Sequence, residues 1–188
     1  MIDNNDNKQF VEPKEKVEML FKIISRYDFY INSTNSKASI IIAWNGIIIG
    51  SILLNYNSII ALYCKQEWAY YISNVFLVGL AISGILSIGF VFKVVNPFLS
   101  SSDSKKGSPK SLIFFGDVSE ITHEEYARRA SELTYEESLS DSIFQAHILA
   151  TGLSRKMKDM QQSIRAINCG LLIIILLISL KGVIAYVR

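Results

Sequence analysis

Three long apolar segments limit what this chain can fold into. They run from about residue 38 to 63, from 68 to 92 and from 167 to 187, and Lys181 is their one charged residue. A helix that crosses a bilayer needs about 20 mostly apolar residues. A chain of 188 residues has too little other mass to cover two such helices in a soluble core. The sequence therefore predicts an all-α membrane protein with three transmembrane helices.

The composition supports this class and excludes others. Half of the residues are apolar and 19% are charged, whereas a soluble domain has about 25% charged residues. Such a chain is too apolar for intrinsic disorder. Two cysteines cannot form a disulfide scaffold. A net charge of +2 does not indicate nucleic-acid binding.

The distribution of Lys and Arg predicts the orientation of the spans. Residues 1–37 and 93–166 carry sixteen of the 19 basic residues, and the 64–67 turn and the C-terminal end carry the other three. Basic residues near span ends favour the cytoplasmic side. We therefore expect residues 1–37 and 96–166 in the cytoplasm, a helical hairpin over 38–95, and a third span over 167–188 with the C-terminus outside.

The cytoplasmic segments also have helical patterns. Apolar residues at three- and four-residue steps predict an amphipathic helix over 12–36 that runs into the first span. After the break at Asn96-Pro97, residues 99–111 are typical of a loop, and 112–121 could form a short strand or a membrane-proximal tether, which we favour. Capping-box spacing at Thr122 and Thr134 predicts a helix over 123–132 and a long one from 135.

The long helix carries a heptad pattern and leads into the third span. The pattern could pack on the 12–36 helix, on the same helix of a second subunit, or on both, and the sequence does not separate these alternatives. Its apolar positions, our candidates for stalk and oligomer packing, are Leu139, Ile143, Ala146, Ala150, Leu153, Met157, Met160 and Ile164.

The sequence has no motif for catalysis or for a cofactor. It lacks a phosphate-binding Gly-rich loop, a nucleophile elbow and metal-ligand spacing. His123 with Glu124 and Glu125 could form a metal or acid–base site, but a helix-capping turn explains these residues better. We expect a protein that is not an enzyme, with no catalytic residue, metal or cofactor.

Polar residues inside the spans are candidates for a conduction path, because they are costly in lipid and often face a bundle interior. In the first span these are Asn45, Ser51 and Asn55, and the second span adds Ser73, Asn74, Ser83 and Ser87. The alternative is hydrogen bonding and close packing between helices. A single chain with three spans cannot surround a pore, so a pore would require several copies.

Basic residues outside the spans are candidates for ligand binding. The candidates are Lys37, Arg128, Arg129, Arg155, Lys156 and Lys158. They could bind the phosphates of a nucleotide or contact anionic lipid headgroups. Lipid contact is favoured for 155–165, because this segment adjoins a span, and both alternatives stand for 128–129.

Several short motifs follow one another along the chain in a fixed order. They are Tyr30-Ile31, Asn35-Ser-Lys37-Ala38, Asn45-Gly46, Asn96-Pro97, Phe114-Phe115-Gly116-Asp117, Glu125-Tyr126, Ser140-Asp141, Gln145, His147-Ile-Leu149 and Arg155-Lys156. Over about 15–187 the chain resembles the Pycsar-effector transmembrane family of bacterial anti-phage defence. One position departs from the family pattern, because Asn35 stands where the family tends to have Asp two residues before the lysine.

The resemblance implies a function in abortive infection. A partner cyclase or nucleotidyltransferase would make a nucleotide messenger, either a cyclic nucleotide or a short oligonucleotide. The effector, a homo-oligomer such as a tetramer in the bacterial inner membrane, would bind this messenger and form or gate an ion-conducting pore that depolarises or disrupts the membrane. The alternatives are a scaffold that recruits a soluble partner through the heptad helix, and a constitutive toxin that a partner restrains.

Overall fold

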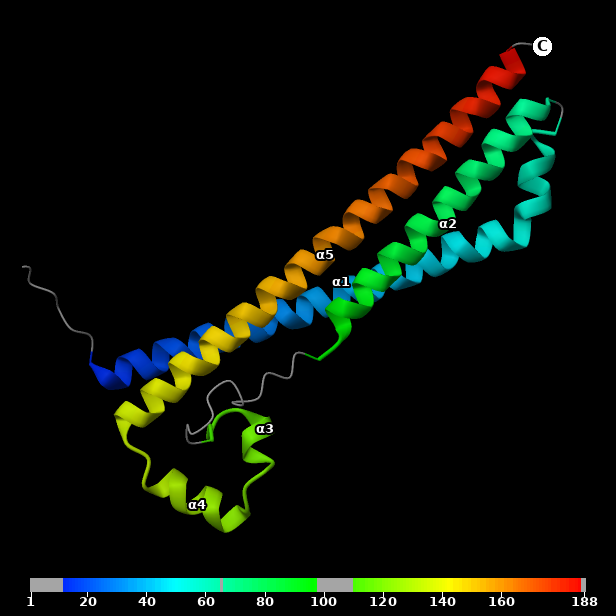
Figure 1. The fold of residues 1–188 in the computed structure, drawn as a ribbon. Coiled ribbons are helices and arrows are strands. Elements are labelled where there is room, and N and C mark those ends of the chain that lie inside the picture. The colour runs from blue at the N-terminus through cyan, green and yellow to red at the C-terminus, as the bar shows by residue number, and fades with distance from the viewer. Residues whose placement is uncertain (1–11, 65, 98–109, 187–188) are drawn as a thin grey trace, which may run out of the picture. The chain divides into compact units, whose positions relative to one another are not determined.

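The computed structural model describes residues 12–64, 66–97 and 110–186, and in these residues the chain contains helices and no strand (Figure 1). The helices are α1 (Pro13–Ala61), α2 (Glu67–Val95), α3 (Phe115–Val118), α4 (His123–Ser131) and α5 (Tyr135–Tyr186). Three of them, α1, α2 and α5, are long and apolar enough to cross a membrane. The predicted all-α membrane fold is confirmed.

Two of the predicted spans continue the helices that precede them without a break. Helix α1 joins the predicted amphipathic helix to the first span, and α5 joins the predicted heptad helix to the third. Both junctions lack proline and glycine, which would end or kink a helix. The predicted loop over 99–111 lies almost wholly outside the described residues.

The segment over 112–121 forms neither a strand nor an extended tether. Residues 115–118 form the single turn α3, and a following turn leads into α4. A strand needs a partner for its backbone donors and acceptors, and the described residues offer none. The Ser111 hydroxyl instead accepts hydrogen bonds from the backbone N–H groups of Ile113 and Phe114.

The chain divides into two compact units, and the division passes through α1 and α5. The first unit combines residues 1–30 and 97–153, and we call it the α3–α4 unit. The second combines residues 31–96 and 154–188, and we call it the three-span unit. The boundaries predicted from charge, at 37 and 166, lie several residues further along each helix.

In the three-span unit, α2 packs through a stripe of mostly small residues. Its buried positions recur at three- and four-residue steps and are Ala69, Ser73, Leu77, Leu80, Ser83, Gly84, Ser87, Val91 and Val94. Small residues allow helix backbones to approach closely, which is how helices associate in lipid. One apolar cluster joins Ala38, Val91, Val94 and Met160, and another joins Tyr63, Leu77 and Leu177.

The α3–α4 unit is held by hydrogen bonds from the segment before α3. The backbone N–H of Ser111 donates to the buried carboxylate of Asp117 at 2.9 Å, and the N–H of Leu112 donates to Asp141 on α5 at 2.9 Å. Thr122 accepts from the Glu125 N–H and Thr134 from the Glu137 N–H, each at 3.3 Å. The box at Thr134 is reciprocal, because the Thr134 N–H donates to the Glu137 carboxylate at 2.9 Å. Each threonine therefore starts a helix where the sequence predicted one.

The heptad pattern of α5 is only partly buried within one chain. Ala146, Leu153 and Met160 are buried, whereas Ile143, Met157 and Ile164 remain 53%, 40% and 44% exposed. The buried stripe contains the polar residues Ser142, Gln145, Lys156 and Ser163 as well. Packing against a second subunit through the exposed positions stays a prediction.

Candidate functional site

A chain of hydrogen bonds crosses the three-span unit. The side-chain amide of Asn45 on α1 donates to the Ser87 hydroxyl on α2 at 3.1 Å, and Ser87 shares a hydrogen bond with Ser163 on α5 at 2.9 Å. All three side chains are buried, Asn45 with 5% exposure. We call these residues the polar layer. The layer links all three spans within one chain.

A small cavity lies against the polar layer. Its volume is about 40 Å³, and its lining includes Trp44, Asn45, Ser83, Gly84 and Gly170. The two glycines allow the close approach of the helices. A Cβ atom at Gly170 would lie 2.6 Å from the Ser83 hydroxyl, and one at Gly84 would lie 3.0 Å from the Ile49 side chain.

Lys156 caps the end of α2 in the same unit. Its ammonium donates to the carbonyl oxygens of Val94 and Asn96, the latter at 3.1 Å, and to Asn35 Oδ1 at 3.4 Å. The side chain is buried, and burial lowers the pKa of this lysine, which precedes the third span. A cation at a helix C-terminus satisfies carbonyls that have no intrahelical partner. A nucleotide phosphate would have to displace these contacts to reach Lys156.

The other two pore candidates have different surroundings from Asn45. Ser51 and Asn55 are exposed on α1, and the Asn55 amide donates to the Ser51 carbonyl of its own helix at 3.0 Å. Among the described residues, neither side chain forms a hydrogen bond with another span. Asn45 alone of the three candidates is joined to α2.

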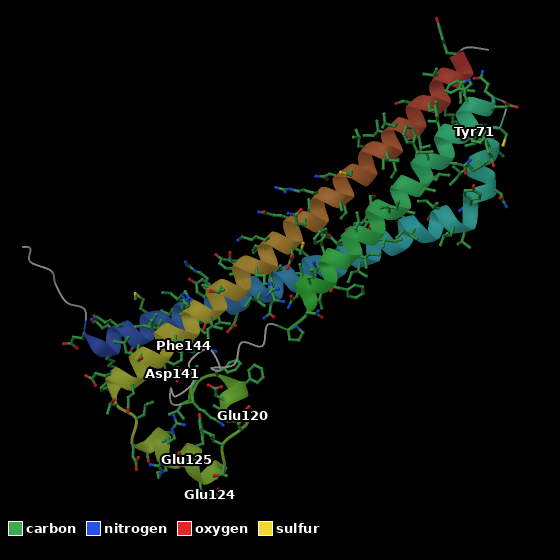
Figure 2. All side chains as sticks on the ribbon, in the orientation of Figure 1. Tyr71, Glu120, Glu124, Glu125, Asp141 and Phe144 are labelled. Carbon is green, nitrogen blue, oxygen red and sulfur yellow. The ribbon has the colours of Figure 1, made fainter. Side chains whose placement is uncertain are left out.

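The basic candidates in the α3–α4 unit already have partners. Arg128 pairs with Glu125 and Glu132, each at 2.9 Å, and the hydrogen bond to Glu125 raises the pKa of Arg128. Arg129 donates to the backbone carbonyl of Lys110 at 2.6 Å, and Lys110 pairs with Glu120 at 2.9 Å. Figure 2 shows Glu124, Glu125 and Glu120 around α3 and α4. Arg128 is therefore paired with carboxylates, and Arg129 is held by a backbone carbonyl.

The basic candidates in the three-span unit other than Lys156 are open to solvent. Lys37, Arg155 and Lys158 are exposed. In the part of the chain that the structure describes, none of them pairs with a carboxylate. They are available to an anion from outside the chain.

His123 does not form a metal site with its acidic neighbours. Among residues 12–64, 66–97 and 110–186, no group of three His, Cys, Asp or Glu side chains could hold a metal ion. His123 is the first residue of α4, directly after the capping residue Thr122. The helix-capping interpretation therefore accounts for this segment.

The sequence analysis missed Ser163, which completes the polar layer. Ser163 lies three residues after Met160 and seven after Lys156, in the stripe that α5 buries. A search for small polar residues at heptad spacing just before the third span would have found it.

The comparisons with known proteins yield one match. A family model described as the Pycsar effector protein domain matches residues 19–181, which include the polar layer, Lys156 and most of both compact units. The chain belongs to this family. The search of curated proteins and the search of solved structures found no match.

Membership of the Pycsar effector family agrees with the three membrane-spanning helices. The family is one of membrane effectors and is not a known family of enzymes. The structure also gives a context for Asn35, where the resemblance implies an Asp. The Asn35 side chain faces Lys156, so a carboxylate at this position would lie beside the Lys156 ammonium.

Proposed function

We propose that this protein is an anti-phage effector of the bacterial inner membrane that becomes permeable to ions when its cytoplasmic part binds a nucleotide messenger. Its N-terminus and the α3–α4 unit would face the cytoplasm and its C-terminus the outside, as the Lys and Arg bias suggests. The observation that carries the proposal is the polar layer, because buried hydrogen-bonding side chains within spans are costly unless they serve packing or a path.

The polar layer would act as the closed contact of the path. Asn45, Ser87 and Ser163 satisfy one another in the state described here. A shift of α5 would break the Ser87–Ser163 bond and leave hydroxyl groups that water can hydrate. A ligand can produce this shift only if it binds the open packing better than the closed one.

The messenger would bind basic residues of the cytoplasmic part. Lys37, Arg155 and Lys158 are exposed and without a carboxylate partner among the described residues, so they can bind phosphate directly. Arg128 and Arg129 would have to exchange Glu125, Glu132 or the Lys110 carbonyl for a phosphate. This exchange is a means of coupling ligand binding to a rearrangement of the α3–α4 unit.

Several copies would be required for a pore. Three spans cannot enclose a channel, and the exposed heptad residues Ile143, Met157 and Ile164 are apolar positions that a second α5 could cover. A homo-oligomer, for example a tetramer, would satisfy both requirements. A nucleotide cyclase or nucleotidyltransferase would supply the messenger.

An ion-flux measurement in liposomes tests the proposal. The full chain is inserted into vesicles loaded with a potassium-sensitive dye, and cyclic mononucleotides and short cyclic oligonucleotides are added one at a time. We expect flux with one of these classes, and a loss of at least tenfold in apparent nucleotide affinity for Arg129→Gln or Arg155→Gln. Lys14→Gln, an exposed lysine near the start of α1, is the matched control.

The same measurement separates the alternatives. Flux without any nucleotide would indicate a constitutive toxin that a partner restrains. A correctly inserted protein that gives no flux with any nucleotide would contradict the proposal and favour a scaffold.

A further inference from the structure

The register between α2 and α5 places Arg165 at an unexpected depth. Ser163 on α5 shares a hydrogen bond with Ser87 on α2. Lys156, seven residues before Ser163, donates to the carbonyl of Val94, seven residues after Ser87. The two helices therefore run side by side over this stretch. At 1.5 Å per residue, the backbone of Arg165 lies about 13 Å further along α5 than that of Lys156.

α1 and α2 present mostly apolar residues over the stretch between these two levels, with Lys93 at its Lys156 end, whereas α5 itself is polar there. On α2, the segment 88–92 contains no charge, and Phe92 is 57% exposed. On α1, Asn45 is level with Ser87, and Ile40 and Trp44 on the Lys156 side of it are exposed as well. Isoleucine and phenylalanine favour the hydrocarbon of a bilayer, and tryptophan favours its interface. Arg165 thus lies beside apolar surface that extends beyond it toward the Lys156 end.

The uncharged lengths of the two helices differ strongly. On α2 the run from Trp68 to Phe92 has 25 residues, about 37 Å, and on α5 the run between Arg165 and Lys181 has 15 residues, about 22 Å. The hydrocarbon core of a bilayer is about 30 Å thick. The α2 face is therefore longer than the core and the α5 face shorter.

Arg165 has no counter-charge of its own within the described residues. Its side chain is exposed, and no hydrogen bond or ion pair joins it to another described residue. An exposed charge in lipid is accommodated by snorkelling, local thinning of the bilayer or water defects. A guanidinium also binds phosphate oxygens through two parallel hydrogen bonds.

We propose that Arg165 binds the phosphate of a membrane phospholipid and draws the headgroup layer inward along the outer face of α5. The ligand is a phospholipid, because Leu172 and Leu176, on the same face of α5 as Arg165, are exposed apolar side chains that suit acyl chains. The bilayer is then locally thinner beside α5 than beside α2. Ser163 is two residues from Arg165 and faces α2, so the polar layer lies at the depth of the thinned face but on the opposite side of α5. This lipid site does not depend on nucleotide gating.

The depth of Cys169 tests the proposal. Cys169 is an exposed free thiol four residues after Arg165, so the two side chains lie on the same face of α5. A Cys64→Ser background leaves Cys169 as the one cysteine, to which a thiol-reactive fluorophore is attached. In phosphatidylethanolamine–phosphatidylglycerol vesicles, we expect spin labels at the headgroup to quench this fluorophore more than labels in mid-chain. Arg165→Leu should reverse this order, whereas Lys158→Leu, an exposed cation near the Lys156 level, should not. An unchanged order in Arg165→Leu would overturn the proposal.

A second measurement does not require that the leucine variant inserts. With 13C at the arginine ζ carbons and a buffer free of phosphate and nucleotide, the lipid is the sole source of 31P. We expect a carbon–phosphorus dipolar contact in the wild type that Arg165→Gln reduces and Arg128→Gln, which loses a guanidinium paired with Glu125, does not. No reduction in Arg165→Gln would overturn the proposal. Displacement of the contact by added inorganic phosphate would also do so, because the site would then be one for a free anion.

Discussion

The Asn45 amide nitrogen lies 3.1 Å from the Ser87 hydroxyl oxygen, and this bond joins the first span to the second. Asn45 is ten residues from Asn55, another asparagine of the same span, yet Asn55 bonds the backbone of its own helix. The pair makes a matched test of what a buried amide contributes. One of the two amides holds helices together, and the other does not.

Asn45→Leu should therefore weaken the three-span unit, whereas Asn55→Leu should not. Hydrogen bonds between helices in membranes contribute about 0.6–2 kcal/mol, and we expect a destabilisation of this size. Unfolding in mixed detergent micelles, followed by circular dichroism, measures the difference. If the two leucine variants have the same stability, the Asn45–Ser87 bond does not hold α1 to α2.

Gly170→Ala should destabilise the packing of α5 on α2. The added Cβ would lie 2.6 Å from the Ser83 hydroxyl, so the helices must separate or Ser83 must change rotamer. Overpacking of this kind costs about 1–3 kcal/mol. Gly182→Ala, on the same helix with no atom within 4 Å of its new Cβ, is the control and should leave the stability equal or higher. Equal stability of both alanine variants would show that α5 has room to move at Gly170.

Lys156→Met should loosen the end of α2. The substitution removes the ammonium that satisfies the Val94 and Asn96 carbonyls, and it also removes a buried charge, so global stability can change little. The local effect is measured by hydrogen exchange of the peptide around Asn96, whose N–H bonds the Phe92 carbonyl. We expect several-fold faster exchange there. In the control variant Lys158→Met, which removes an exposed lysine, this peptide should exchange at the wild-type rate. Equal exchange rates in the wild type, Lys156→Met and Lys158→Met would contradict the capping role of Lys156.

The capping box at the start of α5 should respond to pH. The backbone and hydroxyl hydrogen bonds of Thr134 lower the pKa of Glu137 below its ordinary value. A carboxyl group whose pKa is lower in the folded state stabilises that state fully above its unfolded pKa of about 4.3. This stabilisation is lost as the pH falls through the lower, folded value.

Thr134→Val tests this linkage, because it keeps the shape of the side chain and removes the hydroxyl. We expect the pKa of Glu137, followed by 13C NMR of the side-chain carboxyl, to rise in the variant. The protection of amides in the first turn of α5, taken against the intrinsic exchange rate at each pH, should fall below pH 4 in the wild type. A variant with the same Glu137 titration as the wild type would show that the hydroxyl contributes nothing.

The local features of the fold followed from the sequence. The helix starts at His123 and Tyr135 were predictable. Each follows a threonine whose hydroxyl accepts a hydrogen bond from the backbone N–H three residues later. The absence of a helix breaker between Arg26 and Ala38 predicted one continuous α1. These features depend on residues that are close in sequence, and periodicity and capping describe such residues well.

Features that join distant residues were not predictable in the same way. The segment around Phe115 was interpreted as a strand or a tether, and it became the turn α3 because Ser111 and Asp117 satisfy its backbone. The heptad pattern left open whether Ile143 and Met157 pack on the 12–36 helix, on a second subunit or on both, and one chain leaves them exposed. The pattern describes which side of a helix is apolar and not which neighbour covers it.

The sequence alone determined that the chain crosses a membrane three times, because length and apolarity are properties of each segment by itself. Only the tertiary structure decided that Asn45 meets Ser87, that Lys156 caps α2, and that Arg165 is level with apolar surface of α1 and α2. These relationships depend on the relative register of the helices. Register is set by the close packing of small residues such as Gly84 and Gly170 against neighbouring helices, and no single segment contains that information.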